Sequence, residues 1–172
     1  MLKAVYLFTL FSFVLFSCQA EKNRSKYPDT VGDIAFDSKL DEAGFKKCGA
    51  GKNKHFSFQY YHGPQKFDYK GEKNAIVEKL KKENIYSEKK INGYITVRFL
   101  VNCEGKTGLF RLKHMNSELK DIALDEELEN RLLKFTTLLN GWMPKEIEGL
   151  KVDYYQYLTY KIEDGKVSEV LP

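Results

Sequence analysis

The chain has 172 residues, a length that suits one ordinary domain with a leader and a tether rather than a multidomain enzyme. Its formal net charge of +4 is too small to require a nucleic-acid partner, and we expect none. Aromatic residues make up 14% of the sequence, which excludes a wholly disordered chain and favours strands that pack rings on a pleated surface.

An uncharged apolar run over residues 4–17 follows a single basic residue, Lys3, as in the core of a signal peptide. At about 1.5 Å per helical residue the run reaches roughly 21 Å, which is less than the ~30 Å of hydrocarbon that a spanning helix must cross. The sequence therefore predicts a lipoprotein signal peptide over residues 1–17 and no permanent transmembrane helix.

The run ends in Leu15-Phe16-Ser17-Cys18, which resembles a lipobox, the motif whose cysteine is acylated and becomes the new N-terminus. We expect a lipid on Cys18 to hold the chain on a membrane of a Gram-negative cell envelope, at the periplasmic face of the outer membrane. Acyl chains anchor firmly because each buried methylene contributes about 0.8 kcal/mol. The alternative is an ordinary secretory signal with an incidental cysteine.

The mature chain divides into three parts. Residues 18–33 are polar and predict a flexible tether. Residues 34–65 mix apolar positions with glycine and proline, and predict an ordered extension with one short strand near 55–61. Regular hydrophobic patterns begin after that, so residues 66–172 are predicted to form the folded domain.

The periodicity in this domain predicts an alternation of helices and strands. Residues 72–84 and 125–140 repeat apolar side chains at helical spacing, whereas 91–103, 107–115 and 150–162 alternate apolar and polar side chains as half-buried strands do. The order helix, strand, strand, helix, strand predicts an α+β domain in which two helices pack on one face of a small antiparallel sheet.

That order resembles the C-terminal domain of the TonB family, which couples an inner-membrane motor to outer-membrane transporters. The resemblance covers about residues 67–167 and implies a non-enzymatic protein-interaction domain linked to outer-membrane transport. The spanning helix and the long Pro-rich segment of TonB have no counterpart here, so we do not expect full force transmission. The residues that carry the resemblance are Gly93 to Gly105, Leu124 to Glu127, Gly141-Trp142-Met143-Pro144 and Gly149 to Val152.

We expect an envelope protein or extended peptide to bind by strand addition along the edge of residues 150–162. Tyr155, Tyr157 and Thr159 form an aromatic, uncharged centre on this strand, with charged residues at its ends. One alternative is that residues 56–61 already cover the edge. Another is an envelope structural or stress lipoprotein with no TonB-like coupling.

Cys48 and Cys103 are the cysteines that remain once Cys18 is acylated, and an oxidising compartment would let them form a disulfide. The alternative is two separate thiols. Five lysines, on or just after the first helix, form a basic side that could touch anionic lipid headgroups or peptidoglycan, but a solvated charged face is the default interpretation. They are Lys79, Lys81, Lys82, Lys89 and Lys90.

The sequence contains no nucleophile elbow, Walker loop or dinucleotide-binding motif. His55, His62 and His114 do not stand at metal-ligand spacing. We therefore predict no catalytic residue, no metal site and no cofactor. The enzymatic alternative requires a site in the 34–65 extension that collects His55, His62 and a carboxylate.

Overall fold

The computed structural model describes residues 32–48, 57–60 and 67–171. Cys18, with the expected signal peptide and nearly all of the expected tether, lies outside the described residues. In the part of the chain that is described, no helix is both long and apolar enough to cross a membrane.

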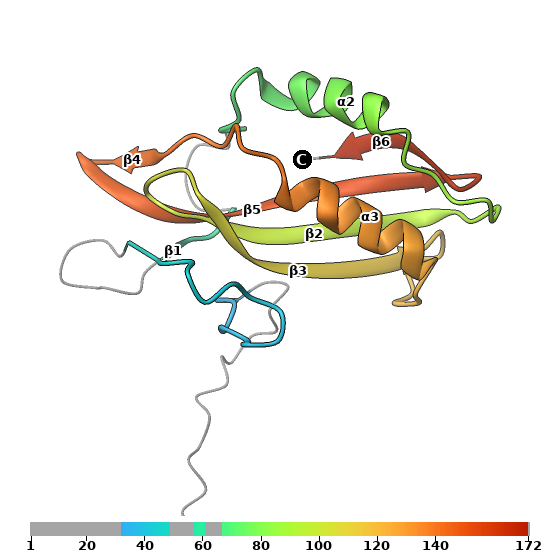
Figure 1. Ribbon diagram of the computed structural model, residues 1–172, viewed down its shortest axis with the longest axis horizontal. Helices are drawn as coiled ribbons and strands as arrows, with labels where there is room; N and C mark the ends of the chain where they lie inside the picture. Colours follow the sequence, from blue (N-terminus) through green and yellow to red (C-terminus); the bar gives the residue numbers. More distant parts are fainter. Residues whose placement is uncertain (1–31, 49–56, 61–66, 172) are drawn as a thin grey trace, which may run out of the picture.

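The described residues form an α+β fold, as the sequence predicts (Figure 1). The two expected helices and three expected strands all appear within a few residues of their expected limits, and the short strand near 55–61 is present as β1. The elements are β1 (Ser57–Phe58), α2 (Glu72–Glu83), β2 (Gly93–Val101), β3 (Thr107–Asn116), α3 (Glu126–Thr137), β4 (Lys145–Ile147), β5 (Leu150–Glu163) and β6 (Lys166–Leu171).

Strand β5 organises the sheet, because it pairs with four other strands. It runs antiparallel to β2, β4 and β6, and β2 runs antiparallel to β3. β1 instead runs parallel to β5, with Ser57 opposite Asp153 and Phe58 opposite Tyr154. The expectation of a purely antiparallel sheet is therefore wrong, and the sheet is mixed.

Two hairpin strands were not expected from the sequence, β4 and β6. Asp164 and Gly165, with φ of 49° and 77°, turn the chain from β5 into β6. Glu148 and Gly149, with φ of 53° and 76°, connect β4 to β5 in the same way. Two consecutive residues with positive φ form the tight turn that matches the twist of an antiparallel hairpin. As a result β5 is not the last strand.

The main core lies between the two helices and one face of the sheet (Figure 1). α3 buries Leu128, Leu132 and Phe135, whereas Ile76 and Leu80 are the two buried residues of α2. Trp142 packs against Phe67, Tyr69 and Phe99, with ring centroids 4.9 to 5.5 Å apart, and so closes one end of this core.

Residues 32–48 cover part of the opposite face of the sheet, where a second apolar cluster is buried. Phe45 lies against Gly108, and a Cβ at that glycine would stand 2.3 Å from the ring, so the close approach requires glycine. This half of the expected extension is thus a layer of the domain. The buried residues of the cluster are Ile34, Leu100, Leu109 and Tyr155.

The extension is fastened to the sheet by polar contacts and a disulfide. Asp153 is only 1% exposed, and its two carboxylate oxygens accept the amide protons of Cys48 and Cys103 at 2.8 and 3.0 Å. These two cysteines are joined as expected, with their Cα atoms 5.9 Å apart. Arg111 adds a bidentate ion pair with Asp41, both contacts at 2.8 Å. Burial raises the pKa of Asp41, but its hydrogen bonds and the charge of Arg111 bring that pKa below its ordinary value.

We expect the disulfide to stabilise the fold substantially. Cys48 and Cys103 are separated by 55 residues, and closing such a loop in the unfolded chain is worth about 4 kcal/mol on the chain-entropy model. Replacing both cysteines with serine should lower the urea midpoint, and reductant should then have no further effect. Cys18→Ser is the matched control. An unchanged midpoint, or two free thiols in the mass of unreduced protein, would contradict the expectation.

Candidate functional site

The three residues expected to form a partner-binding edge are already engaged inside the domain. Tyr155 lies beneath the extension, where its hydroxyl accepts the amide proton of Ile34 at 2.9 Å. Burial raises the pKa of Tyr155 to about 12. The ring of Tyr157 meets that of Tyr60 edge-on, with centroids 5.5 Å apart. The hydroxyl of Thr159 is hydrogen-bonded to that of Thr96 at 2.9 Å.

The side of β5 that faces away from β2 is also occupied at two places. β1 pairs with Asp153 and Tyr154, and β6 pairs with residues 159–163. The extension therefore covers the edge in part, as the alternative from the sequence supposes. Because only a short stretch lies between these two pairings, a partner strand cannot align along the full length of β5.

Within the described residues, β3 and β6 are the strands of six or more residues whose outer sides have no strand neighbour along most of their length. β3 carries a bulge, in which Leu109 and Phe110 stand opposite Phe99 and Leu109 has a φ of 55°. Arg111 and Lys113 follow directly. Bulges and cations are common devices that keep an edge strand from pairing with other chains. β6 also has a bulge in its pairing with β5 and carries Lys166 and Glu169, so edge protection alone does not distinguish the two strands.

A groove of about 390 Å³ separates the outer side of β6 from α2. Residues 166–170 of β6 all line this groove. One side of β6 pairs with β5, and consecutive residues of the strand line the groove, so its other backbone edge borders the groove. Tyr86 pairs with Lys166 and closes one end. The apolar lining residues are Val77, Leu80, Ile85, Val167 and Val170.

This groove has the geometry of an acceptor for an extended segment. No strand among the described residues pairs with the outer N–H and C=O groups of β6 beyond Lys166, so these groups can pair with the main chain of another strand. Alternate side chains of that strand would then enter the apolar groove beneath α2. The sequence patterns did not predict this site because they did not predict β6, although the Asp164-Gly165 pair is a typical hairpin turn.

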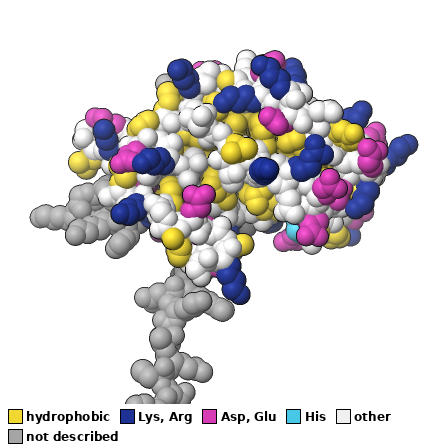
Figure 2. All heavy atoms as spheres, viewed as in Figure 1, with side chains coloured by type: hydrophobic (Ala, Val, Ile, Leu, Met, Phe, Trp, Pro, Cys, Tyr) yellow, Lys and Arg dark blue, Asp and Glu magenta, His cyan; other side chains and the backbone are white. Residues whose placement is uncertain are grey.

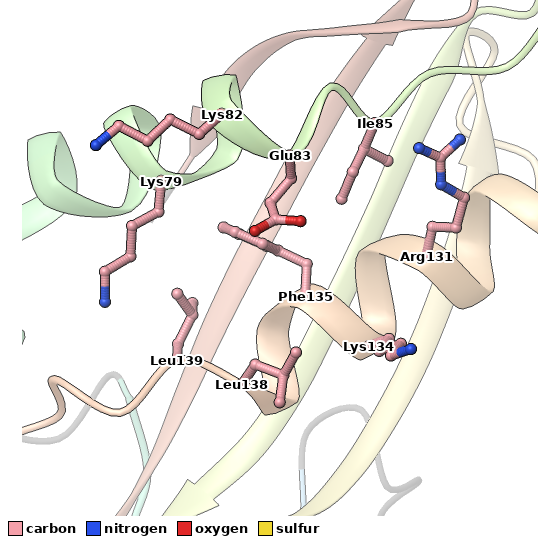
Figure 3. Close-up of a pocket in the computed structure, with 9 residues that line it drawn as sticks. All are labelled: Lys79, Lys82, Glu83, Ile85, Arg131, Lys134, Phe135, Leu138 and Leu139. Atoms are coloured by element: carbon pink, nitrogen blue, oxygen red, sulfur yellow. The ribbon is translucent and has the colours of Figure 1, made fainter.

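A second groove, of about 360 Å³, lies on the other side of α2, between it and α3 (Figure 3). Its floor is apolar and its walls are rich in Lys and Arg. Of the basic residues expected on the first helix, Lys79 and Lys82 line this groove, whereas Lys81 and Lys89 pair with Glu78 and Asp125.

Comparisons with protein-family models, with curated proteins and with solved structures find no match for this chain. The case for a function therefore depends on the geometry of this chain and its sequence motifs.

The described residues provide limited material for catalysis or metal binding. His114 lies 3.2 Å from Glu129 and 3.6 Å from Asp121, at the surface of the sheet edge. His55 and His62 lie outside the described residues. Among the described residues, one set of metal-ligating atoms lies within 4.8 Å, on Cys48, Cys103 and Asp153. Both sulfur atoms of this set are in the disulfide, and the carboxylate accepts two amide protons.

Hydrogen exchange provides a direct test of which edge is open. We expect the amides of β5 to be protected where β2, β1 and β6 pair with it, whereas the outward-facing amides between Val167 and Val170 should exchange rapidly. NMR-detected exchange on the full chain in detergent resolves individual amides. Slow exchange of every β6 amide would show that the edge is already covered.

Proposed function

We propose that the chain is a lipoprotein of a Gram-negative envelope, anchored through Cys18 at the periplasmic face of the outer membrane. Its folded part is a non-enzymatic module that binds an extended peptide of another envelope protein by strand addition. The observation that supports this proposal is the outer side of β6, which borders an apolar groove along Val167 to Val170.

Two sources of binding energy meet at this edge. Main-chain hydrogen bonds to β6 would supply register and affinity, and pockets for alternate side chains would supply specificity. The volume of about 390 Å³ lies near the lower end of the roughly 300 to 1,000 Å³ of ligand sites, so the groove suits a few apolar side chains.

The motifs that resemble TonB C-terminal domains support a link to outer-membrane transport for the same module. In the alternative, the chain is a structural or stress lipoprotein with the same anchor and no peptide partner. The two proposals differ in one measurable property, the capacity of the β6 edge to bind extended peptides selectively.

Peptides selected from a random library on the immobilised full chain should bind at β6 and slow the exchange of its outward-facing amides. Val77→Lys should weaken their binding at least about tenfold, because it removes apolar contact and places a charge in the groove. Lys82→Ala, on the other side of α2, is the matched control.

The urea midpoint of the Val77→Lys variant must match that of the wild type, and Val167→Lys serves as a second variant if it does not. Peptides that bind equally well to these variants, or that leave β6 exchange unchanged, would argue against strand addition. Failure of the library to yield any binder would favour the structural alternative.

The lipid anchor has its own test. Cells that express the full chain and are fed an alkyne fatty acid should label it at Cys18, and Cys18→Ala should lose both the label and the membrane partitioning. Cys48→Ala controls for labelling of other cysteines. A Cys18→Ala chain that keeps its label would show that the anchor has been assigned to the wrong residue.

A further inference from the structure

We propose that the groove between α2 and α3 is a second binding site, which takes an acidic peptide segment that inserts an apolar side chain. The site lies on the opposite side of α2 from the β6 edge. This proposal depends on different residues from those of the β6 edge, and it holds whether or not strand addition occurs.

The floor and walls of the groove differ in chemistry (Figure 3). Ile85, Phe135 and Leu139 form an apolar floor, and Leu138 adds a rim side chain that is 68% exposed. Figure 2 shows hydrophobic surface between Lys and Arg side chains on this face of the molecule. An exposed leucine beside a groove of about 360 Å³ provides apolar contact for one or two side chains, not for a whole helix.

Cations stand on both walls. Lys79 and Lys82 come from α2, Arg131 and Lys134 come from α3, and Glu83 is the only carboxylate among the lining residues. Within the described ranges, no ion pair with a carboxylate involves any of the four cations. The lining of the groove therefore has a local excess of positive charge, and a further carboxylate on α3, that of Glu127, lies one turn from Arg131 and shares a neighbouring hollow with it.

Two of these cations are held in place. Lys79 donates to the hydroxyl of Tyr69 at 2.8 Å. Arg131 donates to the carbonyl oxygens of Asn84 and Tyr86 at 3.1 and 3.2 Å. Such contacts fix the positive groups before a ligand arrives, which reduces the entropy lost on binding.

Helix-end electrostatics account for only part of this pattern. Lys82 and Lys134 lie in the last turns of their helices, where the helix dipole favours cations. Lys79 and Arg131 lie earlier, so the dipole does not explain them. The juxtaposition of four cations around one apolar floor is a property of the tertiary arrangement.

The two-sided distribution of charge identifies the class of ligand. An amphiphile with one anionic head group would satisfy one wall and leave the other unpaired. A peptide with an apolar residue flanked by Asp or Glu would contact both walls and the floor.

The test uses the full chain in a nonionic detergent and a fluorescein-labelled peptide of Glu and Leu, followed by fluorescence anisotropy. We expect saturable binding that weakens as sodium chloride is raised, since salt screens exposed charges. The double variant Lys82→Glu with Lys134→Glu should weaken binding about tenfold or more. Leu138→Ser should weaken it several-fold through loss of apolar contact.

The matched control is Lys73→Glu with Lys166→Glu, which makes the same change in charge at the β6 groove. Its affinity should stay within about twofold of the wild type. An equal loss in both double variants would reduce the effect to net charge and overturn the proposal. Equal binding of a Lys and Leu peptide, or no saturable binding of the acidic one, would also overturn it.

Val77→Lys separates this site from the proposed function. It should leave the affinity for the acidic peptide unchanged while weakening peptides selected on the β6 edge. If Val77→Lys weakens the acidic peptide as strongly as the Lys82→Glu and Lys134→Glu double variant does, the peptide does not bind between α2 and α3, and the proposal fails.

Discussion

The second face of the sheet depends on one buried charge, that of Asp153. A carboxylate without hydrogen-bond partners would be costly at such a site. Its oxygens accept amide protons from Cys48 in the extension and Cys103 after β2, so the charge ties both segments to β5. The disulfide joins the same two residues. With this fastening in place, Tyr155 and its apolar neighbours are covered by the chain itself.

Covering that face determines where the molecule can still bind a partner. The strand that the sequence suggested as an edge is paired on both sides at several places, so among the described strands the outer sides of β3 and β6 remain without a strand neighbour. On the helical face, α3 buries five residues, whereas α2 buries only Ile76 and Leu80. A helix that sits on so narrow a stripe leaves a groove on each of its sides.

The sequence predicted the long elements because their periodicity is local. The alternation in 91–103 and the helical spacing in 125–140 can be recognised without tertiary information. β6 escaped notice because the extra residue Ser168 breaks its alternation and because the strand has only six residues. The packing of Phe45 on Gly108 depends on residues far apart along the chain, and no local pattern reports it.

The cations of the groove between α2 and α3 also could not be brought together by any local sequence pattern. In the sequence, Lys79 and Lys82 are one side of a charged helix, and Arg131 and Lys134 belong to another; only the fold brings both pairs to one floor. At 3.6 residues per turn, Lys73, Val77 and Lys81 face β6, while Lys79 and Lys82 face α3. One helix therefore presents Val77 between two lysines to the edge of β6 and a second pair of lysines to its neighbouring helix. Its position over Ile76 and Leu80 sets the width of both grooves.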